Sequence, residues 1–172
     1  MPDIKQAFPP ILGETPRLLI LGSMPGEASL RLGQYYGHGR NAFWPILCEL
    51  LGVPAEADYS TRTRALIERG IALWDVIAAC ERDGSLDTAI QPASIQVNDF
   101  ATHFEARPGF ARIAFNGGSA EREYRRRVLP SLPDRQRQLP RVRLPSTSPA
   151  HAGMRFEAKL AAWRVLLNWL AD

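Results

Sequence analysis

The sequence predicts an α/β fold, a three-layer α/β/α sandwich around a central, mainly parallel four-stranded sheet. Short apolar runs of strand length alternate along the chain with amphipathic stretches of helical periodicity. No internal repeat and no domain-sized linker interrupts this alternation. Strands that alternate with helices are typical of a parallel sheet covered on both faces. With 172 residues, of which 45% are hydrophobic, the chain is expected to form one domain over residues 1–172.

Four apolar runs are predicted to form the strands. They cover residues 18–21, 71–77, 110–115 and 142–144. The second run fits a buried loop as well as a strand, and its one charged residue, Asp75, either caps the following turn or points into a site. Four residues stand at the ends of these runs: Gly22, Asp75, Asn116 and Pro145. If the strands are parallel, the four loops that follow meet at one edge of the sheet, where such folds bind ligands.

Five segments have the pattern expected of helices. They cover residues 42–51, 61–69, 99–106, 119–128 and 156–170. Ser60 and Asn98 are the predicted N-caps of the second and third helices, and Gly52 and Gly70 the predicted ends of the first and second. Residues 1–16 and 81–97 are predicted to be irregular, and residues 130–140 are rich in proline and arginine.

The composition limits the classes of function. Twenty-one Lys and Arg against 18 Asp and Glu give a net charge of +3, which is compatible with a polyanionic partner without requiring one. The charged face of the 119–128 helix is mainly solvated, and its cationic half can lie along a phosphate backbone. Residues 1–5 have no signal-peptide pattern and no run reaches membrane-spanning length, so a cytoplasmic protein without membrane contact is expected.

The cysteines and histidines predict neither a metal site nor a cofactor. Cys48 and Cys80 are too few for a disulfide framework or an iron–sulfur cluster, and their apolar surroundings predict buried free thiols in a reducing compartment. His38, His103 and His151 lie far apart in the sequence and lack the paired spacing of metal ligands.

The segment after the first predicted strand, GSMPGEASLRLGQYYGHGRNAFW at residues 22–44, is dense in glycine, aromatic and polar residues. Such a loop at the carboxyl end of a strand is typical of a ligand site. It also fits a glycine-rich connection whose tyrosines pack on the core. The segment lacks the Lys-Ser/Thr pair of a phosphate-binding P-loop, which argues against an NTPase.

Five motifs resemble one family when they are taken together and in order. They are GSMPG at 22–26, YYGHGRNAFW at 35–44, GIALWDV at 70–76, FNG at 115–117 and PSTSP at 145–149. The chain resembles the uracil-DNA glycosylase superfamily, and within it the DNA-deoxyinosine (hypoxanthine-DNA) glycosylase branch. The resemblance covers nearly the whole chain and implies hydrolysis of the bond between a deaminated base and its deoxyribose.

The resemblance also implies roles for the matched positions. Met24 stands where most members carry a catalytic Asp or Asn, and the deoxyinosine branch, which shares this lack, has its key amide at the position of Asn41. Tyr36 matches the aromatic residue that stacks on the extruded base, while Asp75 and Asn116 fall where relatives line the base pocket. The positions expected to contact DNA are Gly22, Ser23, Pro25, Gly26, Arg40, Pro145, Ser146, Thr147, Ser148, His151 and Met154.

Several of these residues have a second interpretation. Asn41 is also a suitable cap for the helix that follows it. His38 can pass a proton to the leaving base or simply form a hydrogen bond within the loop. Met154 can fill the gap left by a flipped base or pack under the last helix. Two positions depart from the branch, which usually has Pro at Gly39 and Asn at His151.

The predicted function is therefore that of a monomeric DNA glycosylase acting on DNA that contains deaminated bases, hypoxanthine first. Two alternatives remain from the sequence. The same scaffold can act mainly on uracil or another mismatched pyrimidine. It can also be a non-catalytic nucleic-acid-binding module, since the usual catalyst is replaced at Met24.

Overall fold

The computed structural model describes residues 3–171 and contains a four-stranded sheet with the strand order β3-β2-β6-β7. The four strands are β2 (Leu18–Gly22), β3 (Ile71–Asp75), β6 (Arg112–Asn116) and β7 (Arg141–Leu144). Every neighbouring pair in this sheet is parallel. The predicted α/β class and central sheet are confirmed, and the run at 71–77 is a strand up to Asp75 rather than a loop.

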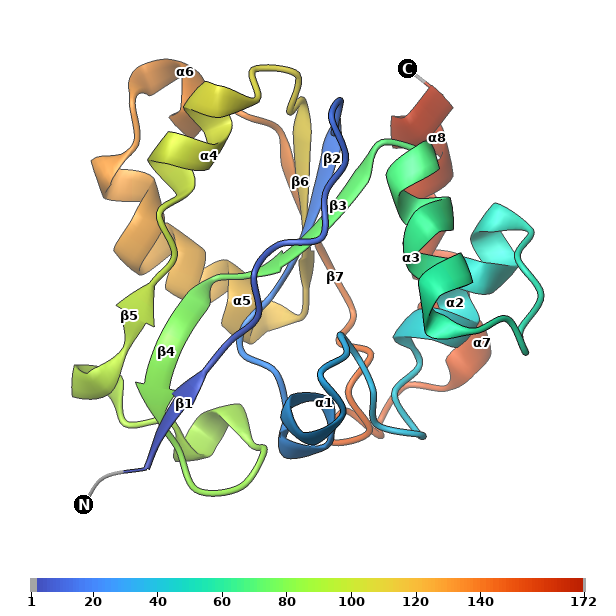
Figure 1. Cartoon of the computed structure of the whole chain (residues 1–172), viewed down its shortest axis with the longest axis horizontal. Coiled ribbons are helices and arrows are strands. Elements are labelled where there is room, and N and C mark those ends of the chain that lie inside the picture. Colours follow the sequence, from blue (N-terminus) through green and yellow to red (C-terminus); the bar gives the residue numbers. More distant parts are fainter. Residues whose placement is uncertain (1–2, 172) are drawn as a thin grey trace.

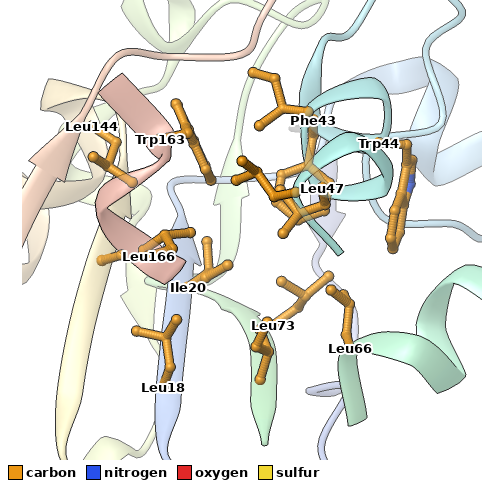
Figure 2. Packing of buried hydrophobic residues seen from close by; sticks show 14 of the residues in the cluster. Leu18, Ile20, Phe43, Trp44, Leu47, Leu66, Leu73, Leu144, Trp163 and Leu166 are labelled. Carbon is orange, nitrogen blue, oxygen red and sulfur yellow. The ribbon is translucent and has the colours of Figure 1, made fainter. Parts of the chain in front are cut away.

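Successive side chains of β2 point to opposite faces of the sheet. Helices cover both faces, which gives three layers. Leu18 and Ile20 face one side of the sheet, where they pack against α2 (Phe43–Leu51), α3 (Tyr59–Glu68), α7 (Phe156–Trp163) and α8 (Val165–Ala171). Figure 2 shows this core, in which Phe43 and Trp163 lie over the strand side chains. Leu19 and Leu21 face the opposite side, which is covered by α4 (Phe100–Ala106) and α5 (Gly118–Glu123) (Figure 1).

A second sheet takes two of its three strands from the segments predicted to be irregular. Strands β1 (Ile4–Gln6), β4 (Ile77–Glu81) and β5 (Gln96–Val97) form an antiparallel sheet in the order β1-β4-β5. Two 3₁₀ turns, η1 (Asp87–Ala89) and η2 (Pro92–Ser94), lie between β4 and β5. The prediction of irregular structure at 1–16 and 81–97 was therefore wrong in part, because these strands are short and carry little apolar periodicity.

Other boundaries also differ from the prediction. Helix α1 (Glu27–Leu32) lies inside the segment read as a loop, and α6 (Asp134–Arg137) lies within residues 130–140. The helix predicted at 119–128 continues from α5 through a π-helical segment, η3 (Tyr124–Val128), into the 3₁₀ turn η4 (Leu129–Ser131). The last predicted helix is divided into α7 and α8 at Arg164.

Both predicted N-caps are corrected. Asp58, not Ser60, caps α3, because its carboxylate accepts a hydrogen bond from the backbone N–H of Thr61 at 2.8 Å. Asp99 caps α4 in the same way, while the Asn98 side chain instead donates to the backbone oxygen of Asp75 at 2.7 Å. The two aspartates stand three residues before the N–H groups that they accept from, which is the usual capping distance.

Candidate active site

A pocket of about 370 Å³ opens at the carboxyl ends of the parallel strands, the lower end of the sheet in Figure 1. Three segments form its walls, and we call them the first loop (residues 22–41), the second loop (residues 145–154) and the third loop (residues 82–90). Strand ends contribute Gly22, Asp75 and Asn116. The convergence of these loops follows from the parallel sheet, because all its strands end at the same edge.

Tyr36 is held in the first loop by its neighbours. Its φ is 55°, a left-handed value that is strained for an aromatic residue. The backbone N–H of Tyr35 donates to the Tyr59 hydroxyl, and the N–H of Gly37 donates to the Ser29 hydroxyl, each at 2.9 Å. These bonds on both sides of Tyr36 stabilise the strained backbone and direct its side chain to the pocket.

The Tyr36 ring stacks on Phe43, with ring centroids 4.0 Å apart and an interplanar angle of 23°. One face of the ring is therefore covered, and only the other face can stack on a base. The Tyr36 hydroxyl is buried and makes no well-formed hydrogen bond to the described residues. Burial raises the pKa of this hydroxyl, and the nearby Asp75 carboxylate raises it further. Tyr35, by contrast, is a core residue, 4% exposed, whose hydroxyl donates to the Pro9 backbone oxygen.

Asn41 and His38 both line the pocket. Asn41 Oδ1 accepts a hydrogen bond from the backbone N–H of Phe43, the first residue of α2, at 2.9 Å, although the N-cap position itself is held by Ala42. This bond orients the amide and leaves a second lone pair on Oδ1 for a water molecule. His38 Nδ1 accepts from the backbone N–H of Arg40 at 3.0 Å, which confirms the hydrogen bond within the loop and leaves Nε2 as the available ring nitrogen.

Asp75 is the buried ionisable group of the pocket, with 3% of the residue exposed. Its Oδ2 has no hydrogen-bond partner among the described residues. The pKa of this carboxyl is raised to about 7, mainly by burial and also by the negative charge of Asp87, against a lowering effect of the Arg82 guanidinium. Since Asp75 ends β3 and faces the pocket, the interpretation as a turn cap is wrong.

Gly22 leaves space for the side chains of Asp75 and Tyr36, because it has no side chain of its own. A Cβ atom on Gly22 would lie 2.5 Å from Asp75 Oδ1 and 3.0 Å from the Tyr36 hydroxyl oxygen. A glycine therefore lets two side chains from different loops meet at the end of β2.

We expect Gly22→Ala to lose most base excision and to lower the melting temperature. The added methyl group must displace Asp75 or Tyr36, and overpacking of this kind costs about 1–3 kcal/mol. Gly39→Ala is the matched control in the same loop, since a Cβ there meets nothing within 4 Å. Thermal melts and single-turnover excision assays check the prediction, which is contradicted if Gly22→Ala behaves like Gly39→Ala.

The side chain of Asn116, at the end of β6, is hydrogen-bonded to the second loop and is not free in the pocket. Its amide nitrogen donates to the Thr147 hydroxyl and its carbonyl oxygen accepts from the Thr147 backbone N–H, both at 2.9 Å. The backbone oxygen of Thr147 in turn accepts from the N–H of Ala42, at the end of the first loop. Thr147 is 1% exposed. These bonds connect the first loop to the second loop and set the spacing between them.

Two side chains of α7 donate hydrogen bonds to the backbone of the second loop. Trp163 Nε1 donates to the backbone oxygen of Pro145, and Lys159 Nζ donates to that of His151, each at 2.9 Å. Lys159 is 5% exposed, and burial lowers the pKa of its ammonium group. The His151 side chain is exposed at the mouth of the pocket.

The sequence did not predict that the third loop forms part of the site. Arg82 is 1% exposed, and its guanidinium donates to the backbone oxygens of Gly84 and Pro25. The Ser23 hydroxyl donates to Asp87 Oδ2 at 2.7 Å, and the N–H of Glu27 donates to the Ser85 hydroxyl at 2.9 Å. The third loop therefore supports the first loop, and no local sequence signal marks it, because its partners are about 60 residues away along the chain.

The structure brings most of the predicted site residues into one pocket. The predicted residues that line it are Gly22, Ser23, Met24, Pro25, Gly26, Tyr36, His38, Asn41, Asp75, Asn116, Ser146, Thr147, Ser148 and His151. Pro145, Arg40 and Met154 are not among the lining residues; Arg40 and Met154 are exposed beside it. Met24 is 8% exposed and packs against Ile77 and Cys80.

Three further features concern the described residues 3–171. Within them, no three His, Cys, Asp or Glu side chains lie close enough together to hold a metal ion. None of their helices has the length and apolar character needed to cross a membrane. Cys48 and Cys80 are both buried free thiols, as predicted.

Comparison with known proteins gives consistent matches. A family model described as the uracil DNA glycosylase superfamily matches residues 9–170. A hypoxanthine DNA glycosylase of Methanosarcina barkeri is 40% identical over 114 residues, 66% of this chain and 71% of the relative. A hypoxanthine DNA glycosylase of Methanosarcina acetivorans is 38% identical over 137 residues, 74% of this chain and 85% of the relative.

A solved structure is also similar over the full length. It is a solution NMR structure of a Methanosarcina acetivorans protein that was provisionally named a uracil DNA glycosylase. The two structures superpose with a TM-score of 0.80 at 32% sequence identity, covering 99% of this chain and 100% of that one.

Proposed function

The chain belongs to the uracil DNA glycosylase superfamily, and we propose that it is a monomeric DNA glycosylase that removes hypoxanthine from DNA. Two relatives that are 38% and 40% identical carry the name hypoxanthine DNA glycosylase, which supports this activity and this base. The structural observation that carries the proposal is the pocket of about 370 Å³, in which Tyr36, Asn41 and Asp75 meet between the two signature loops.

The first step is extrusion of the damaged nucleotide from the duplex. Extrusion costs a few kcal/mol, and stacking of the base on an aromatic ring recovers about 1–3 kcal/mol. Tyr36 offers one ring face for this purpose, since Phe43 covers the other. Small residues of the second loop, Ser146 and Ser148, allow the DNA backbone to approach closely.

The second step is hydrolysis of the glycosidic bond. The C1′–N9 bond breaks with its electron pair leaving on the base, and the sugar develops oxocarbenium character. A water oxygen then bonds to C1′, and the water gives up one proton while the departing base takes one up. The products are free hypoxanthine and an abasic site. Because the cation is a strong electrophile, the water needs positioning more than deprotonation, and the carbonyl oxygen of Asn41 suits that role.

Asp75 is proposed to act on the leaving base. In its protonated form the carboxyl donates a hydrogen bond to an acceptor atom of hypoxanthine, where negative charge collects as the bond breaks. The ionised form would repel that charge. A pKa of about 7 keeps a substantial fraction of Asp75 protonated at neutral pH.

A panel of duplex oligonucleotides, each with one deoxyinosine, deoxyuridine or deoxyxanthosine, tests the proposal. Abasic sites are detected as alkali-labile strand breaks after incubation with the protein. We expect abasic sites at deoxyinosine and none in the undamaged duplex. Binding to the damaged duplex without any abasic site would instead identify a non-catalytic binding module.

Met154 is expected to act in extrusion. Its residue is 37% exposed at the end of the second loop, and an apolar side chain of this kind can enter the space left by a flipped base. We expect Met154→Ala to slow excision from a duplex about tenfold while leaving excision from the same single strand within twofold. Ile67→Ala is the matched control, because Ile67 is also 37% exposed but lies on α3. Equal slowing on both substrates would contradict this role of Met154.

A further inference from the structure

A groove of about 540 Å³ lies beside the base pocket on the outer side of α5 and the edge strand β7. Four arginines line it: Arg122, Arg125, Arg126 and Arg143. We call it the arginine groove. Two of the four come from the π-helical segment η3, and Arg143 comes from β7, so residues separated in sequence converge on one surface. The proposed excision mechanism does not use any of them.

The protein neutralises only part of the charge in this groove, because two of its four arginines have carboxylate partners. Glu121 is the one acidic residue that lines the groove, and it lies 3.8 Å from the Arg143 guanidinium. Glu123 is turned inward, with 11% of its side chain exposed, and pairs with Arg127 at 2.6 Å and with Arg122 at 3.6 Å. Among the described residues, Arg125 and Arg126 form no ion pair. Guanidinium groups held side by side repel each other, and a bound polyanion relieves that repulsion.

The arginine groove adjoins the base pocket through Gly117 and Gly118. A Cβ atom on Gly118 would lie 3.2 Å from Arg143 Nη1, and one on Gly117 would lie 3.0 Å from Ser146 Cβ. Ser146 lines the base pocket, and Gly118 lines the groove. Gly117 has a φ of 94°, which glycine adopts readily, and this turn brings the start of α5 against the second loop. The arginines therefore lie next to Ser146, within reach of DNA that extends past this side of the pocket.

We propose that the arginine groove binds backbone phosphates of the duplex that flanks the lesion, where the DNA passes over the edge strand β7. The inference rests on the proposed DNA substrate and adds a contact surface outside the signature loops. Arginine is suited to this contact because its planar guanidinium donates two parallel hydrogen bonds to a phosphate. Contacts to phosphates position the duplex without reading its sequence.

The test is binding of an undamaged 24-base-pair duplex, measured by fluorescence anisotropy at several salt concentrations. We compare Arg125→Gln/Arg126→Gln with Arg69→Gln/Arg135→Gln, a control pair that removes the same charge. Arg69 ends α3 and Arg135 lies on α6, both exposed and at the opposite end of the sheet. The groove variant should reduce the slope of log K against log salt by about 2 and weaken binding at 0.1 M salt by roughly tenfold or more.

The control pair should change that slope by less than about 0.5. Equal effects of the two pairs would mean that only net charge matters, and would overturn the proposal, as would an unchanged slope in the groove variant. Duplexes shortened from one end at a time give a second readout. Removing the flank that covers the groove should weaken binding by the wild type and not by the groove variant; equal weakening overturns the proposal.

This experiment is separable from the test of the proposed function. Binding of undamaged DNA requires no excision, so the salt slope reports on the groove even if no base is released. With saturating protein, the groove variant should excise hypoxanthine at a rate within twofold of wild type, because its arginines lie outside the base pocket. A larger loss of this rate would assign these arginines to the chemistry and overturn a purely flanking role.

Discussion

Asn41→Ala is expected to lower the single-turnover rate of base excision by about 10²–10³ while binding of damaged DNA stays within a few-fold of wild type. Removal of one well-placed polar group at a reaction centre typically has an effect of this size. Asn41 lines the pocket, and its amide is oriented by the bond that Oδ1 accepts from Phe43 N–H. Met24 at the usual catalytic position has no group that can hold a water molecule.

The same substitution also removes the hydrogen bond to the first N–H of α2, and a control separates the two effects. Loss of a capping side chain costs about 1 kcal/mol of folding free energy. Asp58→Ala removes the cap of α3, whose carboxylate accepts from Thr61 N–H, and Asp58 does not line the pocket. Both variants should lower the melting temperature by a few degrees, and only Asn41→Ala should lose excision. A rate within threefold of wild type would contradict the role of Asn41.

Asp75 should impose a pH dependence on excision. Burial raises the pKa of its carboxyl to about 7, and the groups that face it are Asp87, which raises the pKa, and Arg82, which lowers it. Since the protonated form is proposed to be active, the single-turnover rate should be constant at acidic pH and fall about tenfold per pH unit well above 7. An ionised Asp75 acting as a hydrogen-bond acceptor would give the opposite trend, a rate that rises through pH 7.

Asp75→Asn provides the matched variant, because an amide has nearly the same shape and donates a hydrogen bond at every pH. The fall in rate above pH 7 should disappear in this variant. A further effect follows for stability. Because its pKa is raised in the folded state, the contribution of Asp75 to stability is greatest below about pH 4 and is lost as the pH rises to about 7. Asp75→Asn should therefore melt at a higher temperature than wild type at pH 8.

Most of the sheet could be predicted from the sequence because β2, β3 and β6 are buried almost throughout. The run Leu18–Gly22 is fully buried, and such runs are continuous in apolar residues, so they stand out without a partner. Strands β1 and β5 are three and two residues long and partly exposed, and their pairing with β4 depends on residues distant in the sequence. Local patterns do not carry that information.

The site residues also divide into those marked by a local motif and those placed by contacts distant in the sequence. The first and second loops were predicted because each follows a strand end and carries a motif. Arg82 and Asp87 were missed because their roles come from contacts with Pro25 and Ser23 that fold the third loop onto the first. The resemblance identified Asn116 as a pocket residue, whereas the structure shows that both ends of its amide are bonded to Thr147.

The central claim is that this pocket releases hypoxanthine in preference to uracil. Both bases present a carbonyl acceptor beside an N–H donor, so hydrogen bonding alone does not separate them, and the size of the pocket must. The most direct measurement compares single-turnover release of the free base from two duplexes of identical sequence, one with deoxyinosine and one with deoxyuridine. We expect faster release of hypoxanthine, and faster release of uracil would contradict the proposed preference.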